Sequence, residues 1–327
     1  MLAALQERYG PPEVVRLAEV DRPVPGDDGV LVRVQAASVN RADLDGLGPR
    51  PGFVRLFLGL RAPRNHRTGI DVAGVVDSVG ASVTRFKPGD KVFADLYPHG
   101  GGAFAEFACA PEKAFQSMPA DMSFEDAATL PHSAILALQG LRRRRGGTIK
   151  AGDKVAIVGA SGNVGPFAVQ IAKSMGAEVT GVARTNKLDF VRSLGADHVI
   201  DYTRDDFTKL GERYDRILDM AATRGIADIR RALTKRGVYI VIGGSLPLVF
   251  GTMLVGFVMP LAGKQRAGLP LWKPFNSRDA AELSRMLADG IIKPVIDRRY
   301  PLSEVPDALR HVDDRHAKGK VVITVQS

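Results

Sequence analysis

Lys154-Val-Ala-Ile-Val-Gly-Ala-Ser-Gly-Asn-Val-Gly165 is the stretch of this sequence that decides its fold. The apolar run Val155–Val158 predicts a short buried strand, and a glycine-rich turn follows it. The next segment, Phe167–Lys173, has apolar residues at helical spacing and predicts a helix. We therefore expect a strand, a tight turn and a helix in that order.

The turn is similar to the dinucleotide fingerprint G-x-G-x-x-G, with Ala160 at the first glycine position and Gly159 just before it. Gly162 allows the backbone to approach a pyrophosphate, Gly165 allows the helix to pack on the strand, and the helix N-terminus attracts phosphate. A plain strand-to-helix turn is the alternative, because a glycine pattern alone is weak. The flanking strand and helix favour nucleotide binding. The candidate cofactor-binding residues here are Ala160, Ser161, Gly162, Asn163, Val164 and Gly165.

Four more strand-like segments follow, with helical segments such as 187–194 between them. Strands that alternate with helices predict a parallel, doubly wound α/β sheet, which is the Rossmann architecture. Gly243 and Gly244, which come after the last of these strands, are further candidates for cofactor binding. The predicted strands are Glu178–Ala183, His198–Asp201, Tyr214–Met220 and Val238–Ile242.

The end of the second strand predicts which dinucleotide is bound. An acidic residue there accepts the ribose 2′-hydroxyl of NAD and repels a 2′-phosphate. The segment 182–187 carries no acid and supplies Arg184, Thr185 and Lys187 instead. Arginine can donate two charge-assisted hydrogen bonds to a phosphate, and lysine adds a point charge. We expect NADPH as the cofactor; the alternative is that both cations are simply exposed at a helix start.

Composition sets the class of protein. With 327 residues, of which 45% are hydrophobic, two domains and a large core are expected. The single cysteine, Cys109, excludes an internal disulfide framework and a zinc site built from several cysteines, and it fits a reducing, cytoplasmic location. The net charge of +9 suits an anionic partner such as a phosphorylated cofactor, an acidic carrier or nucleic acid. A solvated basic surface with no specific partner is the more common case.

The first 120 residues are predicted to be β-rich. Valine-rich strands are expected at Gly29–Ala37 and Asp71–Val79, with another at Ala103–Ala108. A helix over Glu125–Gln139 leads toward the nucleotide-binding part. After it, helices are expected at 277–287 and 303–309, and strands at 293–300 and 320–325.

Short segments spread along the chain carry a family pattern: Val39–Asp43, Gly69–Gly74, Lys87–Val92, Gly101–Glu106, the turn at Ala160, Ser193–Asp201 and Gly319–Val322. In these segments the chain resembles the medium-chain dehydrogenase/reductase superfamily, in its zinc-free quinone oxidoreductase-like branch. The segments span nearly the whole chain in the family's order. The resemblance implies a GroES-like catalytic domain formed by residues 1–122 and 277–327, with a Rossmann NADP-binding domain at 123–276 inserted between them and the active site in the cleft.

The resemblance also implies that no metal is bound. In zinc-dependent relatives a cysteine aligns with Asn40 and a histidine aligns with Ile70. A catalytic zinc needs about three protein ligands and an open position. An amide and an aliphatic side chain do not supply them, so we expect a zinc-independent enzyme with no metal ligands.

Three residues are candidates for catalysis. The family position makes Asn40 a candidate for the substrate or nicotinamide pocket; the alternative is that it ties down its own loop. Tyr97 and His132 are candidate proton donors by residue type. Relatives often carry a threonine where this chain has Leu136, so His132 or Ser133 is expected to have a changed role.

The segment 246–263 carries no charge, but its glycines and prolines break any continuous helix, so we expect no transmembrane segment. It is instead a substrate lid, a dimer contact or ordinary core.

The sequence thus predicts an NADPH-dependent reductase of quinones or α,β-unsaturated carbonyl compounds, with a small lipophilic substrate. A homodimer is compatible with it, and nucleic acid is not the expected partner. Two alternatives stay open: an enoyl-thioester reductase of the same fold, and a non-catalytic NADPH-binding sensor or RNA-binding protein.

Overall fold

The computed structural model describes residues 1–48, 55–142, 147–244, 248–249, 251–252, 265–268, 273 and 275–325. The chain forms two compact units. Unit 1 consists of Met1–Ser133, Lys273–Arg285 and Pro294–Ser327, and unit 2 consists of Ala134–Trp272 and Met286–Lys293. The N-terminal and C-terminal parts of the chain therefore share one unit. The segment 246–263, predicted as lid, dimer contact or core, lies almost wholly outside the described residues.

Unit 2 contains a parallel sheet in the Rossmann order. Its strands follow the order β10-β9-β8-β11-β12-β13, which is 3-2-1-4-5-6 when they are counted along the chain, and every neighbouring pair is parallel. The predicted doubly wound α/β fold is confirmed. The strands are β8 (Lys154–Val158), β9 (Glu178–Ala183), β10 (His198–Asp201), β11 (Tyr214–Asp219), β12 (Leu233–Val241) and β13 (Arg266–Gly268).

The helices of unit 2 join these strands. Arg216 of β11 is buried and donates to the carbonyl oxygens of Gly140 and Leu141 at 3.0 and 2.9 Å. Its charge thereby satisfies the last carbonyls of one helix, where a cation is favoured. The strand β12 begins five residues before its predicted start, and β13 was not predicted. The helices are α4 (Ser133–Leu141), α5 (Gly165–Ser174), α6 (Leu188–Ser193) and α7 (Ile226–Ala232).

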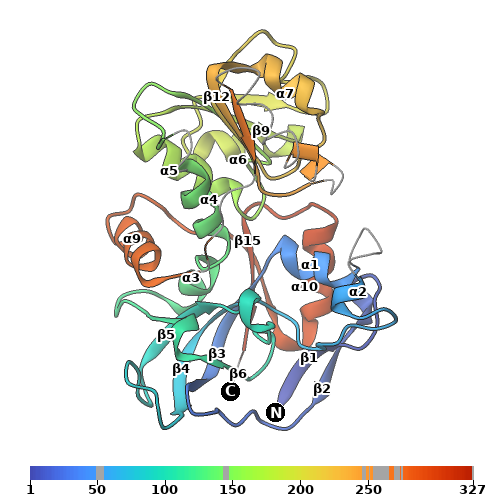
Figure 1. Cartoon of the computed structure of the whole chain (residues 1–327), viewed down its shortest axis with the longest axis vertical. Coiled ribbons are helices and arrows are strands. Elements are labelled where there is room, and N and C mark those ends of the chain that lie inside the picture. Colours follow the sequence, from blue (N-terminus) through green and yellow to red (C-terminus); the bar gives the residue numbers. More distant parts are fainter. Residues whose placement is uncertain are drawn as a thin grey trace. The chain divides into compact units, whose positions relative to one another are not determined.

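Unit 1 is the β-rich unit. Its main sheet has the order β14-β15-β3-β4-β5-β7, with β6 paired to β3, and β1 and β2 form a separate antiparallel pair. The strand β15 pairs antiparallel with β3, so the end of the chain lies against its beginning (Figure 1). The strands are β1 (Leu2–Gln6), β2 (Val15–Glu19), β3 (Gly29–Val39), β4 (Asp71–Val79), β5 (Lys91–Asp95), β6 (Phe107–Pro111), β7 (Phe115–Ser117), β14 (Ile296–Pro301) and β15 (Lys320–Thr324).

Helices cover this sheet. The amphipathic helix α10 buries Val305, Leu309 and Val312 in the same apolar core as β3 and β15. The helices are α1 (Arg41–Leu47), α2 (Arg55–Leu58), α3 (Phe124–Thr129), α9 (Ser277–Ala288) and α10 (Val305–Asp313), of which α9 contributes residues to both units.

Two expectations from the sequence need correction. The single helix predicted over 125–139 is two helices, α3 and α4, separated at Leu130–His132. Pro131 accounts for the break through its missing N–H, which cannot continue the hydrogen bonding of α3, whereas Leu130 before it keeps helical backbone angles (φ −83°, ψ −42°). The strand predicted at 103–108 instead runs over Phe107–Pro111, where it pairs with β3. No helix of the described chain is long and apolar enough to cross a membrane.

Candidate active site

Asn40 lies at the start of α1 in unit 1 and is 1% exposed. Its side-chain nitrogen Nδ2 donates to Asp71 Oδ2 at 2.9 Å and to the Ser38 carbonyl at 3.3 Å. Its oxygen Oδ1 accepts from Lys320 Nζ at 2.7 Å and from Ser133 Oγ at 2.9 Å. These charges fix the amide orientation, because a flipped amide would place its NH₂ against the ammonium and its oxygen against the carboxylate.

The Asn40 amide is therefore saturated. A carboxamide has two N–H donors and two oxygen lone pairs, and all four have partners inside the protein. This geometry favours a structural role for Asn40, in which it ties down its own loop, over a place in the substrate or nicotinamide pocket. We call Asn40 with its side-chain partners Asp71, Ser133 and Lys320 the Asn40 hub. It also explains why an amide stands here: only a side chain that both donates and accepts can join a carboxylate to an ammonium.

Lys320 and Asp71 are the charged pair around this hub, at 1% and 0% exposure. The ammonium lies 3.4 Å from Asp71 Oδ2 and donates to Ser133 Oγ at 3.1 Å. Burial lowers the pKa of Lys320 and raises the pKa of Asp71, while each charge opposes the shift of the other. The Ser38 hydroxyl donates to the same carboxylate at 3.1 Å. Buried charges are tolerated here because each has a partner of opposite sign and further hydrogen bonds.

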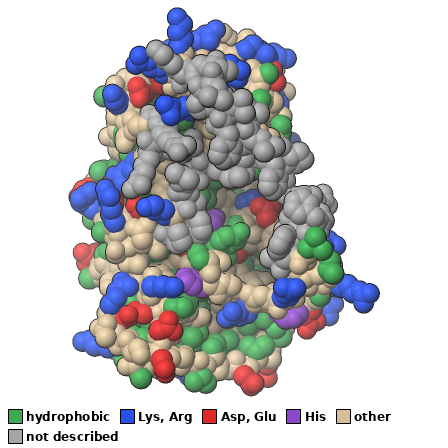
Figure 2. Space-filling view, viewed as in Figure 1, with side chains coloured by type: hydrophobic (Ala, Val, Ile, Leu, Met, Phe, Trp, Pro, Cys, Tyr) green, Lys and Arg blue, Asp and Glu red, His purple; other side chains and the backbone are tan. Residues whose placement is uncertain are grey.

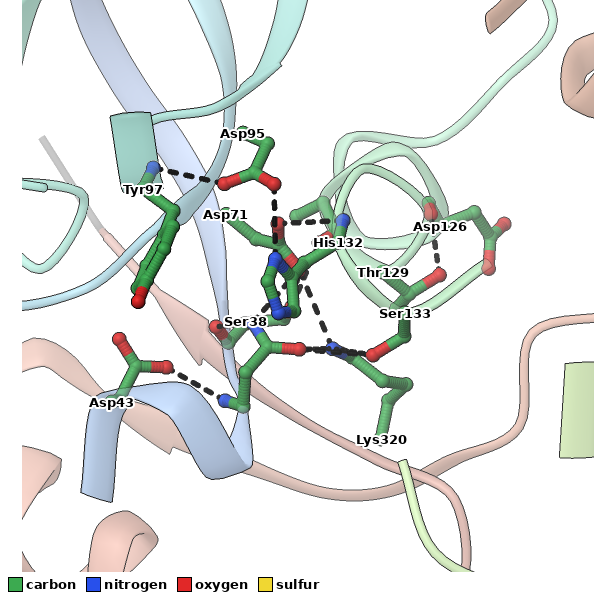
Figure 3. A network of polar contacts seen from close by, with 12 residues as sticks. Ser38, Asp43, Asp71, Asp95, Tyr97, Asp126, Thr129, His132, Ser133 and Lys320 are labelled. Atoms are coloured by element: carbon green, nitrogen blue, oxygen red, sulfur yellow. Dashed lines mark hydrogen bonds and ion pairs between the residues drawn. The ribbon is translucent and has the colours of Figure 1, made fainter. Parts of the chain in front are cut away.

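Asp95, at the end of β5, lies between the two predicted proton donors (Figure 3). Its Oδ2 accepts a hydrogen bond from His132 Nδ1 at 2.9 Å, and its Oδ1 accepts from the Tyr97 backbone N–H at 2.9 Å. The two rings are also neighbours, with centroids 5.8 Å apart. One buried carboxylate thus organises both candidates.

His132 occupies the break between α3 and α4. Its backbone N–H donates to Asp71 Oδ1 at 3.0 Å, so the helix interruption connects the His132–Asp95 pair to the Asn40 hub. Burial by itself lowers the pKa of His132, but the hydrogen bond and charge of Asp95 outweigh it and the pKa is raised. Asp43, on α1, accepts from the Asn40 backbone N–H at 2.7 Å, and burial raises its pKa to about 7.

In unit 2, the glycine turn has the predicted form. Gly159 has φ +84°, which a residue with a side chain rarely adopts. A Cβ on Gly165 would lie 2.4 Å from the Gly159 carbonyl oxygen, so glycine is required for the helix to start against the strand. A Cβ on Gly162 would meet only that oxygen, at 3.6 Å, and would otherwise enter open space.

The remaining residues of the turn differ in accessibility. Ala160 is fully buried, and its backbone N–H donates to the Val182 carbonyl, so neither its methyl group nor that N–H is exposed to a ligand. Ser161 is buried, whereas Asn163 and Val164 are half-buried immediately before α5. The open space at Gly162 and the start of α5 therefore fit a pyrophosphate best.

The predicted 2′-phosphate residues follow β9. Arg184 is exposed, whereas Lys187 is 6% exposed. The Thr185 hydroxyl donates to Asp201 Oδ2 at 2.5 Å, and this hydrogen bond lowers the pKa of Asp201. An acid therefore does lie beside this segment, although segment 182–187 has none. The other Asp201 oxygen, Oδ1, accepts hydrogen bonds from the backbone N–H and the hydroxyl of Thr203 at 3.0 and 2.7 Å, so Asp201 anchors two loops.

Gly243 and Gly244 follow β12. A Cβ on Gly244, which has φ +126°, would lie 2.3 Å from the Ala222 backbone nitrogen, and a Cβ on Gly243 would lie 3.1 Å from the Met220 carbonyl oxygen. The close packing of this turn against the loop after β11 therefore already explains why residue 244 is glycine. The two loops are joined by the Ala222 N–H, which donates to the Gly243 carbonyl at 3.0 Å.

Four functional candidates in unit 1 were missed from the sequence: Asp71, Asp95, Ser133 as a hub contact, and Lys320. Asp71 and Lys320 were quoted only as parts of matching motifs. Their signal was the charge within otherwise apolar strands, since buried charges need partners. Among the described residues, no group of three or more His, Cys, Asp or Glu side chains is arranged to hold a metal ion.

Comparison with known proteins gives the family. Residues 26–120 match the alcohol dehydrogenase GroES-like domain, and residues 194–323 match the domain described as zinc-binding dehydrogenase. The chain is 33% identical over 313 residues to a chloroplast envelope quinone oxidoreductase homolog of Arabidopsis thaliana, covering 93% of this chain and 92% of that protein. It is 32% identical to an NADPH-dependent alkenal/one oxidoreductase of the same plant, with coverage of 99% and 79%.

Solved structures agree. The quinone oxidoreductase from Coxiella burnetii superposes with a TM-score of 0.88 at 28% identity, covering 100% of this chain and 99% of that one. The protein belongs to the medium-chain dehydrogenase/reductase superfamily, in its quinone oxidoreductase-like branch. The family resemblance drawn from the sequence is confirmed.

Proposed function

We propose that this protein is an NADPH-dependent reductase that transfers a hydride to quinones or α,β-unsaturated carbonyl compounds without a catalytic metal. The observation that carries the proposal is the Gly159–Gly165 turn at the strand-order reversal of a 3-2-1-4-5-6 sheet, in a chain related to quinone and alkenal/one oxidoreductases.

NADPH, when bound, supplies the hydride. Unit 2 fits this cofactor. The space beside Gly162 and the N-terminus of α5 would receive the pyrophosphate, and exposed Arg184 would bind the 2′-phosphate. Lys187, which is buried, would contribute its charge nearby.

Zinc independence is part of the proposal. It is supported by the Asn40 amide, whose four hydrogen-bonding positions are taken by protein groups, and by the Lys320 ammonium, which lies 2.7 Å from its oxygen. The Lys320 ammonium already pairs with the Asp71 carboxylate, so that carboxylate needs no metal ion as its partner.

The proposal also includes a small lipophilic quinone or carbonyl substrate, a homodimer and a cytoplasmic location. Figure 2 shows Lys and Arg side chains spread over the visible face and interspersed with acids, an arrangement typical of a solvated surface. Gel filtration with light scattering tests the dimer.

Steady-state turnover tests the activity. Quinones, enones and enoyl thioesters are offered with NADPH and with NADH, and NADPH oxidation is followed by absorbance. We expect the highest kcat/KM with NADPH and a quinone or enone. A clear preference for enoyl thioesters would assign the rival reductase function. Salt-sensitive RNA binding without any turnover would instead assign the non-catalytic one.

A further inference from the structure

The Asp95 side chain is completely buried, and its two oxygens have different tasks. Oδ1 holds the backbone of Tyr97, and Oδ2 contacts the His132 ring. Because an ionised carboxylate only accepts hydrogen bonds, His132 Nδ1 must carry a hydrogen and donate it. The Asp95 contact therefore fixes the tautomer and leaves Nε2 as the ring nitrogen that gains and loses a proton.

We propose that Asp95 is a positioning residue that holds His132 as the acid which protonates the substrate after hydride transfer. This inference rests on the proposed function and deepens it by naming the source of the proton. It also predicts which substrates depend on the pair.

The charges around His132 favour this role. The side chain is 13% exposed, so it is largely shielded but still reaches solvent. Asp95 and Asp71 favour the imidazolium, and Lys320 and burial oppose it, with a net rise of the pKa above 6.5. A raised pKa keeps the ring protonated at higher pH, which an acid working near neutrality needs. The groups that face the ring are Asp95, Asp71, Lys320, Asp43 and the Tyr97 phenol.

The other groups of the cluster fit the role less well. Burial raises the pKa of the Tyr97 phenol above 10, so it is a weaker acid near neutral pH. Lys320 is 1% exposed and its ammonium is engaged by Asn40, Asp71 and Ser133. Asp43, whose pKa is about 7, holds the Asn40 backbone, and it is the one rival that the experiment must separate.

The chemical step balances as follows. The hydride forms a new C–H bond on the substrate, the nicotinamide is oxidised, and the electron pair of the substrate's double bond moves to make an enolate. The proton of His132 Nε2 then bonds to the enolate, and solvent returns a proton to the ring. With a quinone the hydride bonds to a carbonyl oxygen instead, the ring electron pairs shift to make the ring aromatic, and the product is a hydroquinone anion. That anion is much less basic than an enolate, so water can protonate it without an acid from the protein.

The experiment compares His132→Gln, Asp95→Asn and Tyr97→Phe in the full-length enzyme, with a p-quinone and an enone, from pH 5.5 to 9. In the wild type, kcat for the enone should fall as pH rises, with a midpoint above 6.5. His132→Gln should lower enone turnover by about 10²-fold or more at all pH values, the usual worth of an acid, and change quinone turnover only about threefold. NADPH binding, measured by fluorescence, should be unchanged in every variant and so reports intact folding of unit 2.

Asp95→Asn provides the signature of positioning. With its oxygen toward the Tyr97 N–H, the new amide points an NH₂ at Nδ1, which disfavours the imidazolium. The enone profile should therefore shift at least one unit to lower pH, with most of the activity regained at pH 5.5, whereas His132→Gln regains none. Tyr97→Phe tests the phenol as the rival donor: the midpoint of the enone profile should stay at its wild-type pH, and a midpoint that moves overturns the inference.

Contrary results separate the two proposals. Three results would overturn the inference but leave the proposed function standing. The first is enone turnover that is retained in His132→Gln, and the second is an enone pH profile that does not shift in Asp95→Asn. The third is an enone pH profile that shifts in Asp43→Asn and is still present in His132→Gln, which would make Asp43 the acid. A wild-type enzyme that turns over neither acceptor with NADPH overturns the proposed function, and the inference with it.

Discussion

Lys320 Nζ donates a hydrogen bond of 2.7 Å to Asn40 Oδ1, between residues 280 positions apart in the sequence. The bond fastens the first residue of the closing strand β15 to the start of α1. It is part of the register in which Val321 pairs with Val39, so the sheet itself carries the lysine to the hub. The cluster of Asn40, Asp71, Ser133 and Lys320 in unit 1 therefore forms only when both ends of the chain have folded together.

Removal of the Lys320 charge should be strongly destabilising. Lys320→Met leaves the Asp71 carboxylate buried without its cation, and breaking such a pair costs about 3–5 kcal/mol of the free energy of unfolding. The double variant with Asp71→Asn should be more stable than Lys320→Met, because no unpaired charge remains. Urea unfolding measures both, and Lys318→Met, at an exposed lysine two residues away, is the control. Equal losses for Lys318 and Lys320 would show that the buried pair is irrelevant.

Two alanine substitutions in the glycine turn should have different consequences. Gly165→Ala places a Cβ 2.4 Å from a backbone oxygen and should cost about 1–3 kcal/mol of stability. Gly162→Ala adds a methyl group in open space, so the melting temperature should stay the same, while NADPH binds about tenfold more weakly. Calorimetry and cofactor titration separate these effects. Undiminished NADPH affinity in Gly162→Ala would place the pyrophosphate elsewhere.

Arg184→Ala should weaken NADPH selectively. A hydrogen bond to a charged group contributes about 1.5–3 kcal/mol, so NADPH affinity should fall roughly 10- to 150-fold while NADH affinity is nearly unchanged. Arg192→Ala, an exposed arginine in the last turn of α6, is the matched control. Equal losses for both cofactors, or a wild-type preference for NADH, would contradict a phosphate contact at Arg184.

The purified enzyme should contain no stoichiometric zinc and should keep its activity in chelator. The reason is the amide at Asn40 and the aliphatic side chain at Ile70, which leave too few ligands. Metal analysis and turnover after dialysis against chelator check this. Activity that disappears on dialysis and returns with zinc is the contrary result.

Enones of increasing chain length should show rising kcat/KM. Each buried CH₂ contributes about 0.8 kcal/mol, which is about fourfold per methylene until the apolar surface is filled. A homologous series of alkyl vinyl ketones supplies the measurement. If short, hydrophilic acceptors are the best substrates, the apolar segment 246–263 does not contact the substrate.

Local pattern was enough to predict much of this protein. The runs 155–158, 178–183 and 198–201 are strands as predicted, because apolar periodicity and β-branched residues act over a few neighbours. Gly165 was likewise predictable, since the close contact between a helix and the strand before it is local. The break at Pro131 was also a local signal, because proline lacks the N–H that a helix needs, although the predicted helix ran through it.

Only the tertiary structure decided where the charges meet. Asp71, Asp95 and Lys320 begin or end three different strands, and nothing near each in the sequence names its partner. Asp201 reaches Thr185 in the same way, because parallel strands bring their carboxyl ends to one edge. Electrostatic partners are set by distance in space and by loss of water, whereas secondary structure follows from neighbours along the chain. The sequence therefore determined most of the strands and helices and the glycine turn, whereas the packing of the strands determined the cluster of Asn40, Asp71, Ser133 and Lys320.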